Sequence, residues 1–199
     1  MRFTFGIVTE GNGKHLQKVI DSIVAQNIPE YEIIVVGACS IKSPRLTVIP
    51  FDESIKAGWI TRKKNIITET ATFDNIVYLH DYICLGDGWY EGQLQAGDDF
   101  AVRIDKTVNL DGTRGGDWLL CMWDSEFVSS LIGNTMACLL PYHITNLSKY
   151  MYVSGAYFVA KKSIMQKFPF DESRSWGESD DVEWSSRVRK HYDFNINIR

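Results

Sequence analysis

The sequence predicts a single α/β domain in which a mostly parallel central sheet is flanked by helices. Over the first 80 residues, strand-like apolar runs alternate with segments of helical spacing, which is typical of right-handed βαβ units. Polar residues follow several of these runs, where ligands bind in such sheets. The chain has 199 residues, 45% hydrophobic and 23% charged, which suits one compact domain with a core of its own.

The first half contains the clearest elements. A β-rich run leads through a polar loop into a segment whose apolar residues recur at i, i+3, i+4, i+7 and i+8, the spacing of one buried helical face. Pro29 lies beyond the end of this helix. The expected strands are Phe3 to Val8, Tyr31 to Val36, Leu46 to Ile49 and Ile76 to Leu79, and the expected helices are Leu16 to Val24 and Trp59 to Thr70.

The second half is less regular and contains no internal repeat. We expect strands at Phe100 to Ile104 and Tyr152 to Ala160, with a loop-rich aromatic stretch between them. A helix is expected from Asp180 to Lys190, with Ser179 as its N-cap and carboxylates in its first turn, where the helix dipole favours negative charge. An edge strand is expected from Asp193 to Ile198.

Composition excludes several classes of function. The net charge is -4 and no long basic run occurs, so we expect no nucleic-acid partner. The first ten residues lack the apolar stretch of a signal peptide and no run of about 18 apolar residues occurs, so we expect a cytoplasmic protein without a transmembrane segment. Peripheral association with a membrane, through a partner or an acceptor lipid, stays open. The scattered cysteines indicate buried free thiols: Cys39, Cys84, Cys121 and Cys138.

The common nucleotide and hydrolase motifs are missing. The segment TEGNGKHL is not a phosphate-binding P-loop, because Val8 stands where the first glycine is required. It is not a dinucleotide fingerprint either, because Leu16 replaces the last glycine. No GxSxG elbow and no HExxH motif occurs.

His80 and Asp81 follow an apolar strand in the stretch YLHDYI. An aspartate at a strand end can bind Mg²⁺ or Mn²⁺ while diphosphate oxygens complete the coordination. Alternatively, Asp81 caps the following turn, since aspartate is common in loops for local hydrogen bonding. The spacing leaves both interpretations open.

A second acidic cluster, WGESDDVEW, spans residues 176 to 184. The helix dipole explains the acids of the first turn, but it does not explain a preceding loop with an aromatic residue, a glycine and Glu178. Crowded carboxylates raise one another's pKa, as a general base that works near neutral pH requires.

Basic and aromatic residues provide further candidates. Four basic residues could neutralise a diphosphate or could form a solvated face: Lys14, Arg62, Lys63 and Lys64. Four tryptophans could form a stacking platform for a sugar or could pack in the core: Trp89, Trp118, Trp123 and Trp176.

Taken in order, these motifs resemble the family 2 glycosyltransferases, which have the GT-A fold. FTFGIVTEGNGKHLQKVIDSIVAQNIPEYEIIVVGACS resembles the opening strand, helix and second strand of that family, with Thr9 at the threonine of its PTYN loop. GWITRKKN places Lys64 at an Arg-Asn motif, and IVYLHDYI occupies the place of the DxD strand. YVSGAYFVAKKSIMQKFPFDES and WGESDDVEWSSRVRK resemble the acceptor-side segments. The resemblance covers nearly the whole chain.

The resemblance implies transfer of a sugar, with inversion, from a UDP- or GDP-type donor to a hydroxyl of a glycan, lipid-linked or small-molecule acceptor. Asp181 would be the base, and Asp180 or Glu178 could hold that role or orient the acceptor. Asp81 would bind a divalent metal, Mn²⁺ or Mg²⁺. The implied nucleotide-binding residues are Thr9, Glu10, Gly11, Gly37, Ala38, Arg62, Lys64 and His80, and the implied acceptor-side residues are Gly155 and Trp176. About residues 1–82 would form the nucleotide-binding half and about 83–199 the acceptor-side half of one GT-A-like domain.

The chain departs from the family pattern at three places. Gly37-Ala38-Cys39-Ser40 replaces the usual Asp-Asp-Gly-Ser, and His80 and Tyr82 flank Asp81 where two aspartates are usual. The sequence ends at Arg199, before acceptor-side elements that many relatives possess. These departures motivate a second hypothesis, a catalytically silent nucleotide-sugar-binding or scaffold domain. A sugar-1-phosphate nucleotidyltransferase is disfavoured, because the glycine-rich basic loop of that class is not evident.

Overall fold

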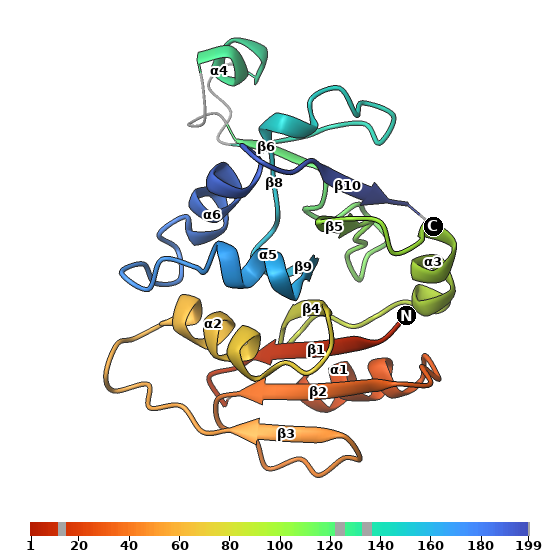
Figure 1. The fold of residues 1–199 in the computed structure, drawn as a ribbon, viewed down its shortest axis with the longest axis vertical. Coiled ribbons are helices and arrows are strands. Elements are labelled where there is room, and N and C mark those ends of the chain that lie inside the picture. The colour runs from red at the N-terminus through yellow and green to blue at the C-terminus, as the bar shows by residue number, and fades with distance from the viewer. Residues whose placement is uncertain (12–14, 122–125, 133–136, 199) are drawn as a thin grey trace.

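The computed structural model describes residues 1–11, 15–121, 126–132 and 137–198. Its centre is a seven-stranded sheet in the order β10-β5-β9-β4-β1-β2-β3 (Figure 1). The registers are parallel for every neighbouring pair except those of β9, which runs antiparallel to both β4 and β5. The prediction of a mostly parallel sheet is confirmed.

The first half matches the predicted elements closely. Strands β1 (Phe3–Val8), β2 (Tyr31–Val36) and β3 (Leu46–Ile49) and helix α1 (Leu16–Val24) have the expected bounds. Helix α2 (Ile60–Thr70) begins one residue later than expected, and β4 (Asn75–His80) extends one residue further at each end. Because α1 leads from β1 to β2 while β4 pairs on the other side of β1, the strand order reverses between β1 and β4.

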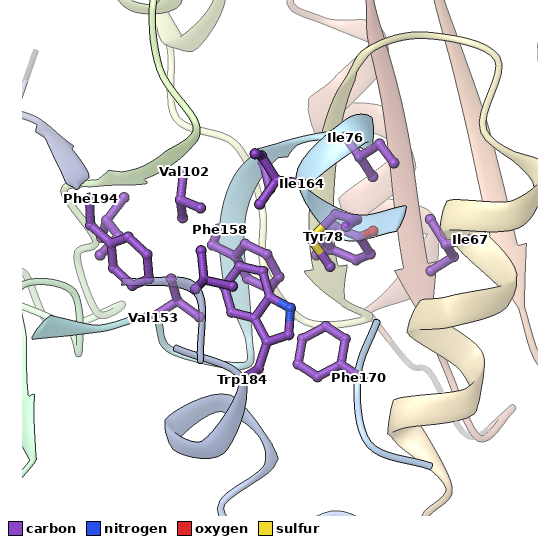
Figure 2. Packing of buried hydrophobic residues seen from close by; sticks show 14 of the residues in the cluster. Ile67, Ile76, Tyr78, Val102, Val153, Phe158, Ile164, Phe170, Trp184 and Phe194 are labelled. Atoms are coloured by element: carbon purple, nitrogen blue, oxygen red, sulfur yellow. The ribbon is translucent and has the colours of Figure 1, made fainter. Parts of the chain in front are cut away.

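Alternating side chains of these strands build two cores on opposite faces of the sheet. Phe3, Phe5 and Ile7 of β1 pack with the buried face of α1 in one cluster. On the other face, Tyr78 of β4 and Ile67 of α2 belong to a larger cluster with residues of the C-terminal half. Figure 2 shows this second cluster, in which Phe158, Phe170 and Trp184 lie together. The ring centroids of Phe170 and Trp184 are 5.4 Å apart. The two cores hold the strand ends in fixed positions.

The second half adds further helices and a smaller sheet. A three-stranded sheet, in the order β7-β6-β8, lies in the stretch that was expected to be loops. The helices here are α3 (Trp89–Ala96), α4 (Glu126–Ile132), α5 (Lys162–Lys167), α6 (Asp180–Val188) and the 3-10 helix η2 (Ser148–Tyr150). The strands are β5 (Val102–Asp105), β6 (Leu119–Cys121), β7 (Ala137–Leu139), β8 (Met151–Tyr152), β9 (Tyr157–Lys161) and β10 (Phe194–Asn197), and β10 is at an edge as expected.

The prediction of one strand from Tyr152 to Ala160 is wrong. The chain turns between β8 and β9, where the amide of Tyr157 donates to the carbonyl of Ser154 across 3.1 Å, and the two strands enter different sheets. An apolar run does not reveal such a turn, because the residues on either side of it are buried in the same core. The turn carries Gly155 to the acidic helix α6.

The start of α6 also differs from the prediction. Ser179 immediately precedes the helix, but its backbone is left-handed, with φ of 55°, and its side chain makes no capping hydrogen bond. The carboxylate of Asp181 instead accepts the amide proton of Val182 across 2.8 Å. The three acids predicted for the first turn, Asp180, Asp181 and Glu183, are confirmed there.

Most of the described tryptophans pack in the core. Trp118 is buried, and Trp89 stacks edge-on against Phe3 and donates to Asp105. Trp176 is 71% exposed, whereas Trp123 lies outside the described residues. Trp176 is therefore the described tryptophan best placed to contact a ligand.

Two other sequence expectations concern the surface. All four cysteines are thiols as expected, but only Cys121 is buried. Cys84 is exposed, and Cys39 and Cys138 are half-buried, so the expectation of four buried thiols is confirmed for Cys121 alone. Within the described ranges, no helix has the length and apolar character needed to cross a bilayer.

Candidate functional site

A cavity of about 500 Å³ opens where the strand order reverses between β1 and β4. In open α/β sheets this crevice, beyond the carboxyl ends of the strands, is where ligands bind. Val8 of β1 pairs with His80 of β4, so the residues that follow both strands face the same space. The cavity is lined by Val8, Thr9, Glu10, His15, Gly58, Ile60, Lys63, His80, Asp81, Tyr82 and Trp176. We call it the donor cavity, because the family resemblance predicts that a nucleotide donor binds at these strand ends.

Thr9 and Asp81 line the donor cavity and are joined by a hydrogen bond. The Thr9 hydroxyl donates to Oδ2 of Asp81 across 2.6 Å and accepts the amide proton of Gly11 across 3.1 Å. The carboxylate thus binds the neighbouring strand instead of capping its own turn. Among the described residues, Oδ1 of Asp81 has no hydrogen-bond partner, so one oxygen of this carboxylate is available to a ligand.

Lys63 of α2 fixes the same strand end from the opposite side. Its buried ammonium donates to the Thr9 carbonyl across 2.8 Å and forms an ion pair with Glu53. Sequence reasoning placed Lys64 and Arg62 at the nucleotide and considered Lys63 as one of several diphosphate candidates. Lys63 differs from Lys64 in the direction in which its side chain leaves the helix. The sequence does not reveal which of the two directions faces the donor cavity, because this depends on how α2 packs against the sheet.

Gly37, Ala38 and Gly11 support the donor cavity without belonging to its described lining. Gly37 has φ of 133°, and a Cβ on it would lie 2.1 Å from the Thr9 carbonyl oxygen, so a larger residue cannot take its place without moving β1. A Cβ on Gly11 would lie 2.7 Å from Cβ of Ala38. The two predicted strand ends therefore touch each other.

His80 lies between the donor cavity and a second one. Its Nδ1 is 3.1 Å from the Tyr82 hydroxyl, while Nε2 is buried and makes no hydrogen bond to any described residue. Burial lowers the pKa of His80 to about 3, and the nearby positive charges of Lys64 and Lys63 act in the same direction. His80 is therefore neutral at physiological pH and can offer Nε2 to a polar ligand.

The second cavity, of about 360 Å³, adjoins the first and is lined by two of the three predicted acidic residues, Asp180 and Asp181. Its lining shares Ile60, His80, Tyr82 and Trp176 with the donor cavity. The other described lining residues are Lys64, Cys121, Ala137, Tyr152, Ser154, Gly155, Ala156, Gly177, Ser179, Asp180, Asp181 and Val182. We call it the acceptor cavity, because the family resemblance predicts that the acceptor binds beside these residues.

Asp181 is held in the acceptor cavity by two backbone amides. Its Oδ2 accepts from Gly155 across 2.8 Å and its Oδ1 accepts from Val182 across 2.8 Å. Burial raises the pKa of Asp181, the negative charge of Asp180 raises it further, and the two amides and Lys64 oppose that rise. The carboxylate is thus more basic than an ordinary aspartate, as a general base requires.

Asp180 is paired with a lysine of α2. Its carboxylate forms a buried ion pair with Lys64, with Nζ 3.1 Å from Oδ2. Lys64 also lies over the ring of Phe170, 4.6 Å from its centroid. Lys64 thus lines the acceptor cavity and is absent from the described lining of the donor cavity.

Trp176 lies on the loop before α6, and two hydrogen bonds attach this loop to the start of α2. The amide of Trp176 donates to the Gly58 carbonyl across 2.8 Å, and the Thr61 hydroxyl donates to the Arg174 carbonyl across 2.7 Å. The loop before α6 is therefore fastened to the loop before α2. This contact places an exposed indole at the border of both cavities.

The structure does not bring Arg62 and Glu178 to the described lining of either cavity. Arg62 pairs with Glu69 and Glu172 at 2.7 Å and 3.1 Å, and Glu178 accepts the amide proton of Ser175. Lys14 lies outside the described residues. Tyr152 was missed as a lining residue, because the turn that separates it from β9 was missed.

The donor set for a metal is small. Within the described residues, no group of three or more His, Cys, Asp or Glu side chains is arranged to hold a metal ion. However, Mg²⁺ commonly keeps several waters and binds through one or two carboxylates plus the phosphates of a substrate. Asp81, with one oxygen unpartnered, suits an ion that arrives with a diphosphate.

Comparison with solved structures identifies the fold. The structure of S. aureus TarS residues 1–349 matches with a TM-score of 0.67 at 11% sequence identity, over 98% of this chain and 58% of that chain. The same fragment in complex with UDP-GlcNAc matches with a TM-score of 0.64 at 12% identity, over 98% and 56%. The complex with UDP gives a TM-score of 0.65 at 12% identity, over 98% and 57%.

These matches show that the chain has a GT-A-like fold, with a mostly parallel central sheet flanked by helices. The chain spans somewhat more than half of the TarS fragment. No protein-family model and no curated protein sequence matches it.

Proposed function

We propose that this chain is an inverting glycosyltransferase that moves a sugar from a nucleotide-diphosphate donor to an acceptor hydroxyl. The observation that carries the proposal is the pair of adjoining cavities at the reversal of strand order. One contains Asp81 and the other contains Asp181, and His80 and Trp176 line both. A donor in the first cavity would point its sugar toward an acceptor in the second.

The donor would lie along the carboxyl ends of β1 and β4. Thr9, Glu10 and His80 would contact the nucleotide, with Gly11, Gly37 and Ala38 shaping the backbone beneath it. UDP and UDP-GlcNAc, which are bound in the TarS structures, are the first donors to test. The absence of an aspartate at position 38 indicates that base recognition differs from the usual family pattern.

The acceptor would enter the second cavity beside Trp176 and Gly155. Asp181 would take the proton from its hydroxyl as the oxygen attacks the anomeric carbon, while the bond to the nucleotide diphosphate breaks on the opposite face. General-base catalysis of this kind contributes about 10²–10⁴-fold. The raised pKa of Asp181 supports this assignment, and Asp180 is the alternative base.

Asp81 would hold Mn²⁺ or Mg²⁺ together with the donor diphosphate. Such an ion, when bound, neutralises charge that develops on the departing diphosphate. Thr9 keeps the Asp81 carboxylate oriented toward the donor cavity through its 2.6 Å hydrogen bond. This arrangement supports a single-aspartate version of the usual metal motif.

Calorimetry and turnover together test the proposal. UDP and GDP would be titrated with and without Mn²⁺ into the native protein, into Asp81→Ala, and into Asp87→Ala, which removes an exposed carboxylate from the turn that follows. We expect Mn²⁺-dependent binding that Asp81→Ala abolishes and Asp87→Ala retains, together with hydrolysis or transfer from a sugar nucleotide. Binding without turnover would favour a catalytically silent module, which the altered DxD motif makes the second candidate. No binding under any condition would contradict both.

A further inference from the structure

Two neighbouring lysines of α2 serve different cavities. The side chains of Lys63 and Lys64 are 3% and 1% exposed, and each is paired with a carboxylate. Successive helical residues point about 100° apart, because an α-helix has 3.6 residues per turn. Lys63 consequently reaches the Thr9 carbonyl and the donor cavity, whereas Lys64 reaches Asp180 and the acceptor cavity.

The ammonium of Lys64 lies close to the carboxylates of Asp180 and Asp181. Its Nζ is 3.1 Å from Oδ2 of Asp180, and a Cβ placed on Gly155 would be 3.2 Å from both that Nζ and Oδ2 of Asp181. The absence of a side chain at Gly155 therefore lets the lysine and the second carboxylate approach the same point. The acidic pair compensates the buried ammonium in this position. Lys63 is likewise paired, with Glu53, so the cavity that each lysine lines is what distinguishes the two.

We infer that Lys64 is a positioning residue of the acceptor site, which fixes Asp180 and balances its charge beside Asp181, and that the nucleotide is left to Lys63 and the ends of β1 and β4. This inference rests on the proposed function, because it assigns a role within that catalytic site. It differs from the nucleotide-binding role that the family resemblance implies for Lys64.

The charges around Asp181 explain what the ion pair does. From its own helix, Asp180 raises the pKa of Asp181, and from α2, Lys64 lowers it. From β8, Tyr152 faces the same carboxylate, but burial and the charge of Asp181 raise the pKa of that phenol to about 12, so it stays neutral. His80, which lines the same cavity at the end of β4, is neutral as well. The basicity of Asp181 is thus set by burial, which has the largest effect, and is adjusted in opposite directions by one negative and one positive neighbour.

A charge cycle tests the inference directly. The pKa of Asp181 would be measured by NMR titration of protein with ¹³Cγ-labelled aspartate, with the resonance assigned from Asp181→Asn. We expect Lys64→Gln to raise this pKa and Asp180→Asn to lower it. The double variant should lie between the two single variants, because it removes both charges. If Lys64→Gln does not fold, the comparison of Asp180→Asn with the double variant gives the same sign.

Lys63→Gln is the matched control, since it removes a buried lysine from the next position of the same helix. We expect it to weaken nucleotide binding and to leave the pKa of Asp181 close to that of the native protein. Lys64→Gln should do the reverse: it should lower kcat and move the acidic limb of the pH profile upward while the Kd for the nucleotide changes little.

Two results would overturn the inference. One is a pKa of Asp181 that does not move in opposite directions in Lys64→Gln and Asp180→Asn, or that does not rise when Lys64→Gln is added to Asp180→Asn. The other is a loss of nucleotide binding in Lys64→Gln as large as that in Lys63→Gln. Failure of the proposed function would look different, because the native protein would then bind no sugar nucleotide or turn none over while the NMR titration could still be read.

Discussion

Thr9, at the end of β1, donates its hydroxyl proton to Asp81, at the end of β4, across 2.6 Å and 72 positions of sequence. The bond joins the two strands at the reversal of strand order and fixes the orientation of the carboxylate proposed to hold the metal. Residues that orient a metal ligand typically contribute 10–100-fold to metal affinity.

We therefore expect Thr9→Val to weaken Mn²⁺-dependent nucleotide binding by about 10–100-fold. Thr9→Ser keeps the hydroxyl and should bind the nucleotide nearly as well as the native protein. Calorimetric titration of UDP in the presence of Mn²⁺ checks both variants. Equal affinities for the valine and serine variants would show that the Thr9 hydroxyl does not orient Asp81.

Gly155 lies beside both Lys64 and Asp181, and a methyl group on it would crowd both side chains. A Cβ would lie 3.2 Å from Lys64 Nζ and from Asp181 Oδ2, closer than ordinary van der Waals contact, so one of the two groups must move. Misplacement of a catalytic group by 1 Å can cost about 10²-fold in rate. The crowding here requires a displacement of only a fraction of 1 Å. We therefore expect Gly155→Ala to lower kcat by roughly tenfold. Gly86→Ala, where a Cβ meets nothing within 4 Å, should leave kcat unchanged, and equal rates for the two variants would rule out a steric role for position 155.

Asp181 should make the stability of the protein depend on pH. Burial raises its pKa in the folded state, so between the unfolded pKa near 3.8 and the higher folded pKa the native state holds more protons than the unfolded state. Stability is then lost as pH rises through this window and is flat above it. Asp181→Asn lacks this dependence.

Urea unfolding at several pH values tests the sign. We expect the free energy of unfolding of Asp181→Asn, relative to that of the native protein, to increase as the pH rises above about 3.8 and to level off once the pH exceeds the folded pKa. A relative stability that decreases over this range would mean that the carboxylate is stabilised in its charged form, which would argue against its role as the base.

Asp105 organises a buried network outside the described lining of either cavity. Its carboxylate accepts from Gln93 at 2.7 Å, from Asn197 at 3.0 Å and from Trp89 at 3.1 Å, and it also accepts from Tyr157. Removing it takes away the buried acceptor that these donors share. We expect Asp105→Ala to destabilise the protein by roughly 3–5 kcal/mol. Asp98→Ala, which removes an exposed pair with Lys161, should cost less than about 1 kcal/mol, and similar losses for the two variants would contradict the proposed role of burial.

The sequence predicted the strands and helices of the first half well, because each shows an unbroken local pattern. The helical spacing from Leu16 and the apolar run of β2 depend on neighbours within one element. The prediction of one strand from Tyr152 to Ala160 failed, because a run of apolar residues does not show that the chain turns at Gly155 from one sheet to another.

The site was predictable in part. Thr9, His80, Asp81 and Asp181 follow or begin predicted elements, and the structure brings all four to the two cavities. Which lysine of α2 faces which cavity depends on how the helix is rotated against the sheet, and no local pattern fixes that rotation. The bond between Asp181 and the amide of Gly155 likewise depends on tertiary packing.

The most direct test of the central claim is the rate at which Asp181→Asn transfers or hydrolyses sugar from UDP-GlcNAc or another sugar nucleotide with Mn²⁺ present, compared with the native protein. Asparagine keeps the shape of the side chain but cannot take the proton from the hydroxyl of the acceptor. We predict a rate lower by about 10²–10⁴-fold, with nucleotide binding retained. A variant that turns over its donor as fast as the native protein would contradict the assignment of Asp181 as the base.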